Sequence, residues 1–197
     1  SLTAVGFRVL ETRSVPDDLP LLEAALGSLL GSYDLVVVTG GLGPTHDDIT
    51  REAASRALSR PLLRDEAVAE ALRGLAVRHE HPSARTDMFR QADVLKGAEV
   101  LPAVTGSAPG QVIALGGTRV VLLPGPPGEM RPLLERVLAE FSPVTPPARL
   151  RCTGITESDA QQTVQEAIAG YRVELTLLAA PGDVEVVLFP LDDDAAD

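Results

Sequence analysis

The chain runs Val38-Thr-Gly-Gly-Leu-Gly-Pro-Thr-His-Asp-Asp-Ile-Thr-Arg51 between a predicted strand and a predicted helix. The strand is the continuous apolar run at 34–39, and such a run is typical of a strand buried on both faces of a sheet. The helix that follows places Ala53, Ala54, Ala57 and Leu58 at helical spacing. Open α/β sheets bind ligands at such strand ends, so this stretch indicates both the fold class and the position of a site.

The same alternation of strands and helices extends on both sides of this stretch. We predict a doubly wound α/β domain with a mostly parallel sheet, because buried aliphatic strands alternate with amphipathic helices. Its expected elements are a strand at 7–15, a helix from Asp17-Asp18 to Gly31, a helix at 65–80, strands at 99–101, 111–115 and 118–123 with a Gly116-Gly117 turn between the last two, and a helix at 129–140.

A proline-rich segment divides the chain. Three prolines lie in the six residues Ser142–Pro147, which opposes both helix and sheet and favours a linker. After it the pattern restarts as strand 148–153, helix 157–169, and strands 172–179 and 184–189. The sequence therefore predicts a first domain at 1–142 and a small α+β domain of β-α-β-β order at 148–190.

Composition excludes several classes of protein. The 197 residues are 45% hydrophobic, which is enough for a core, and their formal net charge of −11 disfavours nucleic-acid binding. Cys152 is the only cysteine, so neither an internal disulfide nor a cysteine zinc site can form. No apolar run approaches the roughly 18 residues of a membrane helix, and no leader is recognisable. We expect a cytoplasmic protein without membrane contact.

The glycine-rich stretch carries the first candidate site. Gly40, Gly41 and Gly43 permit positive φ and let backbone N–H groups approach an anion, and the next helix points its positive end there. The adjacent carboxylates of Asp47 and Asp48 are suited to a hard divalent cation beside a phosphate.

An alternative explanation of this stretch requires no ligand. Asp47 or Thr45 would cap the following helix, and the glycines would only form the turn. The spacing alone does not decide between the two interpretations.

Two more glycine-containing segments favour a ligand pocket. Pro124–Met130 also follows a buried strand and opens a helix, and Gly106–Gly110 is a third turn of this kind. Together the three segments could line one crevice. None matches the P-loop pattern, so a P-loop ATPase or GTPase is not supported.

The run Thr39–Ala53 resembles the signature of the CinA (competence/damage-inducible protein) family, whose N-terminal domain is similar to molybdopterin-binding domains. Further matches run in order along the chain: Val15–Asp18, Arg90–Ala92, Gly97–Val100, Gly106–Gly110, Leu123–Met130, Gly154–Ser158 and Ala180–Gly182. The last two resemble the small middle domain of the same family.

Three departures from the family pattern stand out. His46 replaces the usual Pro, and Met88 replaces the usual Asn of an Asn-x-x-Gln pattern that ends at Gln91. The family's opening strand has no counterpart here. In a doubly wound sheet such a loss leaves a seam, so we expect another element or a subunit to fill it, or the sheet to rearrange. The C-terminal amidohydrolase domain of many CinA proteins is also without a counterpart.

The resemblance implies hydrolysis of the pyrophosphate of ADP-ribose or a related nucleotide, with a divalent metal such as magnesium and with potassium as a further ion. Asp47 and Asp48 would hold the metal. The residues implied as catalytic are Asp47, Asp48 and Thr50, and those implied as substrate-binding are Thr39, Gly40, Gly41, Gly43, Thr45, Arg51, Gly106, Ser107, Gly125, Pro126 and Glu129. Arg51 could equally form an ordinary ion pair on its helix.

A second interpretation belongs to a different class of function. The chain would bind a pterin or nucleotide without turnover, or dock another protein, because a fold and its loops do not establish chemistry. In either case we expect a small-molecule ligand and a homo-oligomer.

Overall fold

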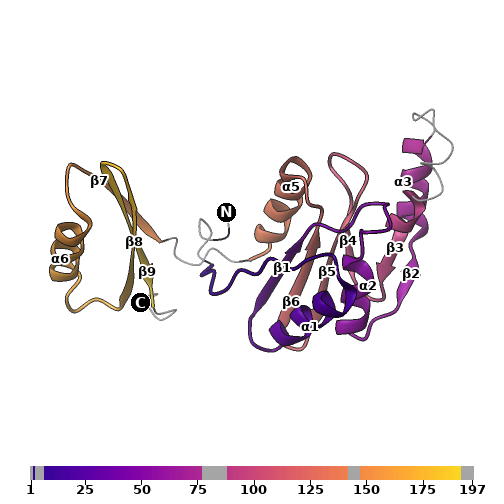
Figure 1. The fold of residues 1–197 in the computed structure, drawn as a ribbon, viewed down its shortest axis with the longest axis horizontal. Helices are drawn as coiled ribbons and strands as arrows, with labels where there is room; N and C mark the ends of the chain where they lie inside the picture. The colour runs from indigo at the N-terminus through magenta and orange to yellow at the C-terminus, as the bar shows by residue number, and fades with distance from the viewer. Residues whose placement is uncertain (1, 3–6, 77–87, 142–146, 192–197) are drawn as a thin grey trace. The chain divides into compact units, whose positions relative to one another are not determined.

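The computed structural model describes residues 2, 7–76, 88–141 and 147–191 (Figure 1). Contacts within the chain divide it into two compact units. The larger unit is Arg13–Val137, and the smaller unit comprises Ser1–Thr12 together with Leu138–Asp197. Most of the predicted linker, residues 142–146, lies outside the described residues.

A four-stranded sheet forms the centre of the larger unit, in the order β1-β6-β5-β4. Its strands are β1 (Leu35–Thr39), β6 (Thr118–Leu123), β5 (Gly110–Leu115) and β4 (Glu99–Leu101). β1 runs parallel to β6, whereas β5 is antiparallel to both β6 and β4. The sheet is therefore mixed, and the prediction of a mostly parallel sheet is wrong. The two-residue turn at Gly116-Gly117 makes the difference, because so short a connection can only join antiparallel strands.

Aliphatic side chains of the sheet and of two helices form the core. The helices α1 (Leu19–Leu29) and α2 (Thr50–Ala57) pack on one face, where Leu26 and Ala53 meet Val120 and Leu122 of β6. Val121 and Leu123 alternate with them along β6, point to the other face and are also fully buried. As predicted, α1 begins after Asp18, whose carboxylate accepts from the Leu21 N–H at 3.0 Å.

In its described part, the larger unit also contains two further α-helices and a two-stranded ribbon. Helix α5 (Pro127–Leu138) follows β6, and α3 (Glu66–Ala76) stands beside a two-stranded antiparallel ribbon, β2 (Leu62–Arg64) with β3 (Asp93–Leu95). The sequence gives no sign of β2 and β3, because three residues are too few to show an alternating pattern. The short 3₁₀ helix η2 (Phe89–Ala92) leads into β3.

The departure at position 88 has a packing explanation. Met88 contacts an apolar cluster of Val68, Ala69, Leu72 and Ala92, formed mainly by α3. A flexible thioether packs favourably against such apolar side chains, whereas an amide would lose hydration beside them.

The predicted strand at 7–15 does not form. Residues 8–14 are exposed and pair with no other strand, although Phe7 contacts Phe141 edge-on with 4.9 Å between ring centroids. Within the described part of the chain, β1 has β6 as its one strand partner.

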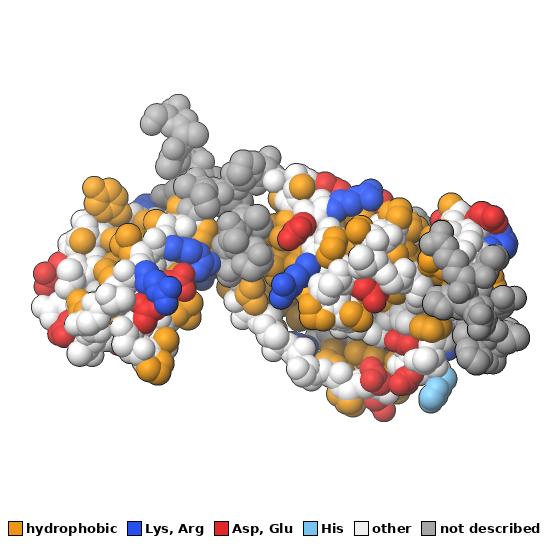
Figure 2. All heavy atoms as spheres, turned by 90° about the horizontal axis from the view of Figure 1, so that it is seen from above, with side chains coloured by type: hydrophobic (Ala, Val, Ile, Leu, Met, Phe, Trp, Pro, Cys, Tyr) orange, Lys and Arg blue, Asp and Glu red, His pale blue; other side chains and the backbone are white. Residues whose placement is uncertain are grey.

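The smaller unit has the predicted β-α-β-β order. It contains β7 (Ala148–Thr153), α6 (Glu157–Ala167), β8 (Val173–Ala180) and β9 (Asp183–Pro190), with an antiparallel sheet in the order β7-β9-β8. Arg149 and Arg151 of β7 form ion pairs of 2.8 and 2.5 Å with β9, and Figure 2 shows basic and acidic side chains intermingled on this unit. Cys152 is a half-buried free thiol in β7. No helix in the described ranges is long and apolar enough to span a membrane.

Candidate functional site

The ends of β1 and β6 bring two of the predicted glycine-containing segments together. The Gly40 N–H donates to the Leu123 carbonyl at 3.0 Å, and the Thr39 hydroxyl donates to the Pro124 carbonyl at 2.9 Å. A Cβ placed on Gly125 would lie 3.4 Å from the Gly40 Cα. Parallel strands end at the same edge of a sheet, which is why segments about 85 residues apart become neighbours here.

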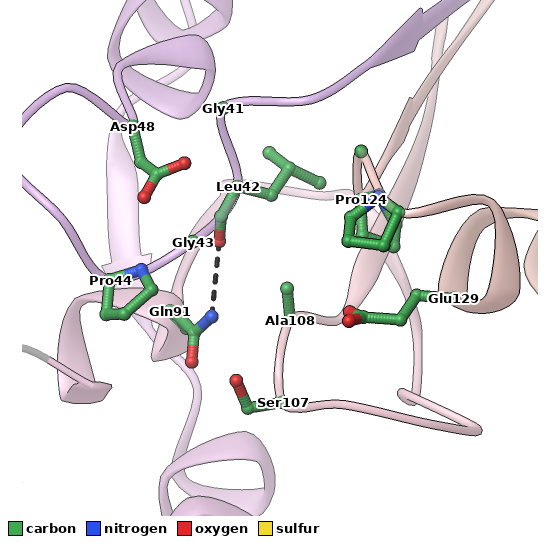
Figure 3. Close-up of a pocket in the computed structure, with 12 residues that line it drawn as sticks. Gly41, Leu42, Gly43, Pro44, Asp48, Gln91, Ser107, Ala108, Pro124 and Glu129 are labelled. Carbon is green, nitrogen blue, oxygen red and sulfur yellow. Dashed lines mark hydrogen bonds between the residues drawn. The ribbon is translucent and has the colours of Figure 1, made fainter.

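A cavity of about 320 Å³ lies at this edge (Figure 3). Seven of its lining residues belong to the predicted site: Gly41, Gly43, Asp48, Ser107, Gly125, Pro126 and Glu129. The others are Leu42, Pro44, Gln91, Ala108 and Pro124. The remaining predicted residues are not on its walls: Thr39, Gly40, Thr45, Asp47, Thr50, Arg51 and Gly106.

Arg51 supports the glycine-rich loop from inside the protein. Its side chain is 2% exposed, and its two terminal nitrogens donate to the carbonyls of Leu42 at 2.5 Å and Gly43 at 3.0 Å. Burial lowers the pKa of this guanidinium. Both donors hold loop carbonyls in place, so Arg51 is a buried support of the loop and not a surface residue in an ordinary ion pair.

Thr50 secures the start of the same loop. Its hydroxyl donates to the Gly40 carbonyl at 2.9 Å, and its N–H donates to the Gly41 carbonyl at 3.2 Å. Gly41 has φ +66°, and a Cβ there would lie 2.2 Å from the Thr50 hydroxyl oxygen. Only glycine fits this position, because both the conformation and the space exclude a side chain.

Asp48 is the carboxylate of the acidic pair that reaches the cavity. Its Oδ2 accepts from the Thr45 N–H at 2.9 Å and from the Thr45 hydroxyl at 2.5 Å. It lies so close to Gly43 that a Cβ on that glycine would be 2.4 Å from Oδ2. The conformation of the turn at Gly43 and the position of the Asp48 carboxylate therefore depend on each other.

Asp47 lies on the exposed side of the same turn. Hydrogen bonding from the Thr45 side chain, and then from its own backbone, lowers the pKa of Asp47. Neither Asp47 nor Thr45 caps α2, because Ile49 precedes the helix and no side chain caps its first turn. The helix-cap alternative of the sequence analysis is thus wrong.

Glu129 forms the opposite wall of the cavity from the first turn of α5. Its carboxylate lies against Gly106, where φ is +73° and a Cβ would be 2.3 Å from the carboxyl carbon. The Thr105 hydroxyl donates to the Gly128 carbonyl at 2.9 Å, which ties this third glycine-containing segment to α5. Figure 3 shows Glu129 and Asp48 on opposite sides of the cavity.

Gln91 is a lining residue that the sequence analysis did not include in the site. It is 1% exposed, and its side-chain amide donates to the Leu42 carbonyl at 3.4 Å. Its neighbour Arg90 donates to the Thr45 carbonyl at 2.9 Å and pairs with Glu52 at 3.0 Å. The available signal was the match at Arg90–Ala92 to the family pattern, since a polar pair next to an alanine carries no chemistry by itself.

The charge of the cavity is determined by its lining residues. Its lining residues include two carboxylates and no Lys, Arg or His. Nor do the described residues contain a cluster of three or more His, Cys, Asp or Glu side chains suited to a metal ion. An anionic ligand would therefore depend on backbone amides, on the N-terminal end of α5 and on an added cation.

Residues 1–144 match the family described as "Probable molybdopterin binding domain". A "CinA-like protein" of Akkermansia muciniphila is 38% identical over 95% of this chain and 47% of its own length, and another from Fervidobacterium nodosum is 36% identical over 71% and 34%. The chain thus spans less than half the length of these relatives. A crystal structure of the protein CinA from Thermoplasma acidophilum is 32% identical, with a TM-score of 0.62 over 71% of this chain and 81% of that one.

The family match covers the whole glycine-lined cavity, and the CinA structure shares the fold of most of the chain. The expected molybdopterin-binding-like fold is thereby confirmed. The chain belongs to the CinA family and contains its molybdopterin-binding-like domain.

Proposed function

We propose that this chain hydrolyses the pyrophosphate bond of ADP-ribose or a related nucleotide in the cavity between the β1 and β6 ends, with the help of a divalent cation. One observation carries the proposal. Two carboxylates face each other across a cavity whose other lining residues are uncharged. A pyrophosphate would be repelled by Asp48 and Glu129 alone but attracted once a cation lies between them.

The donor set fits magnesium. Asp48 lines the cavity with its carboxylate held by Thr45, and hard cations prefer one or two carboxylates plus phosphate oxygens and water. Glu129 supplies a second carboxylate from the other wall, whereas Asp47 lies outside the cavity and is a weaker ligand in this proposal. When bound, the metal polarises the phosphoryl oxygens and lowers the pKa of an attacking water.

The chain's own groups position the substrate. Gly41 and Gly43 line the cavity, where their amides would stabilise charge on the phosphoryl oxygens, and hydrogen bonds from Arg51 and Thr50 hold that loop in place. Gly125 and Pro126 close the side of the cavity next to α5, whose N-terminal end favours an anion.

A second candidate function is binding of a pterin or nucleotide without turnover. The polar side-chain atoms on the cavity walls are mainly acceptors, from Asp48, Glu129 and Gln91. A pterin offers several N–H donors to such a surface. This candidate predicts saturable binding that produces no AMP.

The test is AMP release from ADP-ribose by the purified chain, with magnesium, with EDTA, and with and without potassium. We expect magnesium-dependent turnover that falls at least about a hundredfold in Asp48→Asn and strongly in Glu129→Gln. Asp47→Asn should retain most of the rate, and Glu70→Gln on the exposed face of α3 serves as the unchanged control. Full activity of Asp48→Asn would contradict the metal role.

A further inference from the structure

The side-chain oxygen of Gln91 is buried at the cavity wall without a hydrogen-bond partner among the described residues. The residue is 1% exposed, so bulk water does not satisfy this atom in place of a protein donor. Buried polar atoms are nearly always hydrogen-bonded, and an exception calls for an explanation.

The contacts of the Gln91 amide determine which of its two polar atoms lacks a hydrogen-bond partner. Its nitrogen donates to the Leu42 carbonyl, which also accepts from Arg51. A reversed amide would place two acceptor oxygens against each other, which is unfavourable. The oxygen therefore remains on the other side, and Figure 3 shows it turned away from Leu42, on the side of Ser107.

We propose that Gln91 is a specificity-determining residue that accepts a hydrogen bond from an O–H or N–H donor of the bound ligand. A phosphate oxygen carries no proton for this purpose at neutral pH and would be repelled by the amide oxygen. The Gln91 end of the cavity therefore receives the sugar or the heterocycle, and the pyrophosphate lies elsewhere, along the glycine amides. The inference rests on the proposed function in placing the nucleotide in this cavity.

The chain offers a matched control in Gln111. It is also 1% exposed, but its side-chain oxygen accepts from the Leu95 N–H at 2.8 Å. Replacement of Gln111 with Met leaves a buried N–H unpaired. Replacement of Gln91 removes an oxygen that lacks a partner and one long hydrogen bond to the Leu42 carbonyl, which still accepts from Arg51. The first change should lower stability, and the second should not.

The experiment measures calorimetrically the affinity of each variant for the uncleavable α,β-methylene analogue of ADP-ribose in magnesium. We expect Gln91→Met to weaken binding about tenfold, or about 1.4 kcal/mol, without lowering the melting temperature. Gln111→Met should lower the melting temperature and leave the affinity unchanged. Unchanged affinity in Gln91→Met, with a melting temperature lowered as in Gln111→Met, would overturn the inference.

Two further probes identify the donor and separate this inference from the proposed function. If a ribose hydroxyl is the donor, an analogue that lacks this hydroxyl should bind the wild type about tenfold more weakly than the parent ligand does. Gln91→Met should then bind that analogue no more weakly than the wild type does. Full affinity for such analogues assigns the donor to the heterocycle. If the wild type binds neutral pterin but no nucleotide, and Gln91→Met loses the pterin, the proposed function fails and the role of Gln91 stands. A wild type that binds neither probe overturns both.

Discussion

Gly41 is the residue at which backbone conformation and packing constrain the site most tightly. Its φ is +66°, and the Thr50 hydroxyl oxygen lies only 2.2 Å from the point that a Cβ would occupy, so no side chain fits. The clash is with the supporting threonine and not with the ligand space. A substitution here therefore acts on the fold of the loop before it acts on binding.

We expect Gly41→Ala to lower the free energy of unfolding by about 1–3 kcal/mol, because it strains the backbone and displaces Thr50. Gly74→Ala is the control, since Gly74 lies in α3 with nothing within 4 Å of its Cβ position. That substitution should stabilise the protein by up to about 1 kcal/mol. Chemical denaturation of both variants measures the contrast, and equal stability of the two would contradict the loop geometry.

Thr45 interacts with the carboxylates of both Asp47 and Asp48, although its hydroxyl has only one proton to donate. Its hydroxyl bonds Asp48 at 2.5 Å, and its side chain also lowers the pKa of the exposed Asp47. A carboxyl whose pKa is lowered on folding adds stability above its usual pKa, and this contribution is lost as the pH falls through the lowered value.

Thr45→Val should raise the pKa of Asp47 toward its usual value and so reduce this acid loss of stability. A carbon-detected NMR titration of the Asp47 carboxyl between about pH 2 and 6 follows the change. Identical titration curves in the variant and the wild type would show that the threonine hydroxyl does not stabilise the charged form.

Among the elements, the junction of α1 with β6 depends on one buried hydroxyl. Thr118 is 2% exposed, accepts from the Gly31 N–H at 3.0 Å and donates to the Tyr33 carbonyl at 2.7 Å. It thus connects the end of α1, the loop before β1 and the first residue of β6. The parallel β1–β6 pair that carries both glycine-containing ends begins from this connection.

Thr118→Val keeps the shape but removes both hydrogen bonds and leaves a backbone donor with no side-chain partner. We expect the free energy of unfolding to fall by about 2 kcal/mol. Thr105→Val is a weaker counterpart, because Thr105 is exposed and makes a single bond to the Gly128 carbonyl. Urea unfolding should rank the two losses in this order, and a smaller loss for Thr118→Val would contradict its role at the junction.

The limits of sequence interpretation also appear at the scale of elements. The strands of the sheet and of the smaller unit were predictable because runs such as 118–123 are long, aliphatic and bounded by turns. The direction of β5 depended on the Gly116-Gly117 turn, which predicts a hairpin although the fold class favours parallel strands. Residues 7–15 resembled a strand by composition alone, but a strand requires a partner, which local sequence cannot supply.

The position of the candidate cavity was predictable because glycines mark the strand ends that line it. Gly41, Gly43, Gly125 and the carboxylates of Asp48 and Glu129 do line one cavity. Thr50 and Arg51 lie beneath it, because helical periodicity turns both inward under the loop. Gln91 escaped notice because it reaches the cavity from η2, and only the tertiary fold brings that turn beside the β1 loop.

At the scale of the whole molecule, the larger unit holds all twelve lining residues of the cavity. The chain matches its curated relatives over less than half of their length, so the proposed chemistry concerns this domain. The whole chain has a net charge of −11, and we therefore propose that binding of an anionic nucleotide depends on a cation. That dependence is the central claim of the account.

Phosphorus NMR of ADP-ribose mixed with the chain tests this claim most directly. With magnesium present, we predict that the two pyrophosphate resonances disappear and that two phosphomonoester resonances replace them, from AMP and ribose 5-phosphate. EDTA should stop the conversion, and Asp48→Asn should slow it at least about a hundredfold. Pyrophosphate resonances that persist unchanged with folded wild-type protein and magnesium would contradict the account.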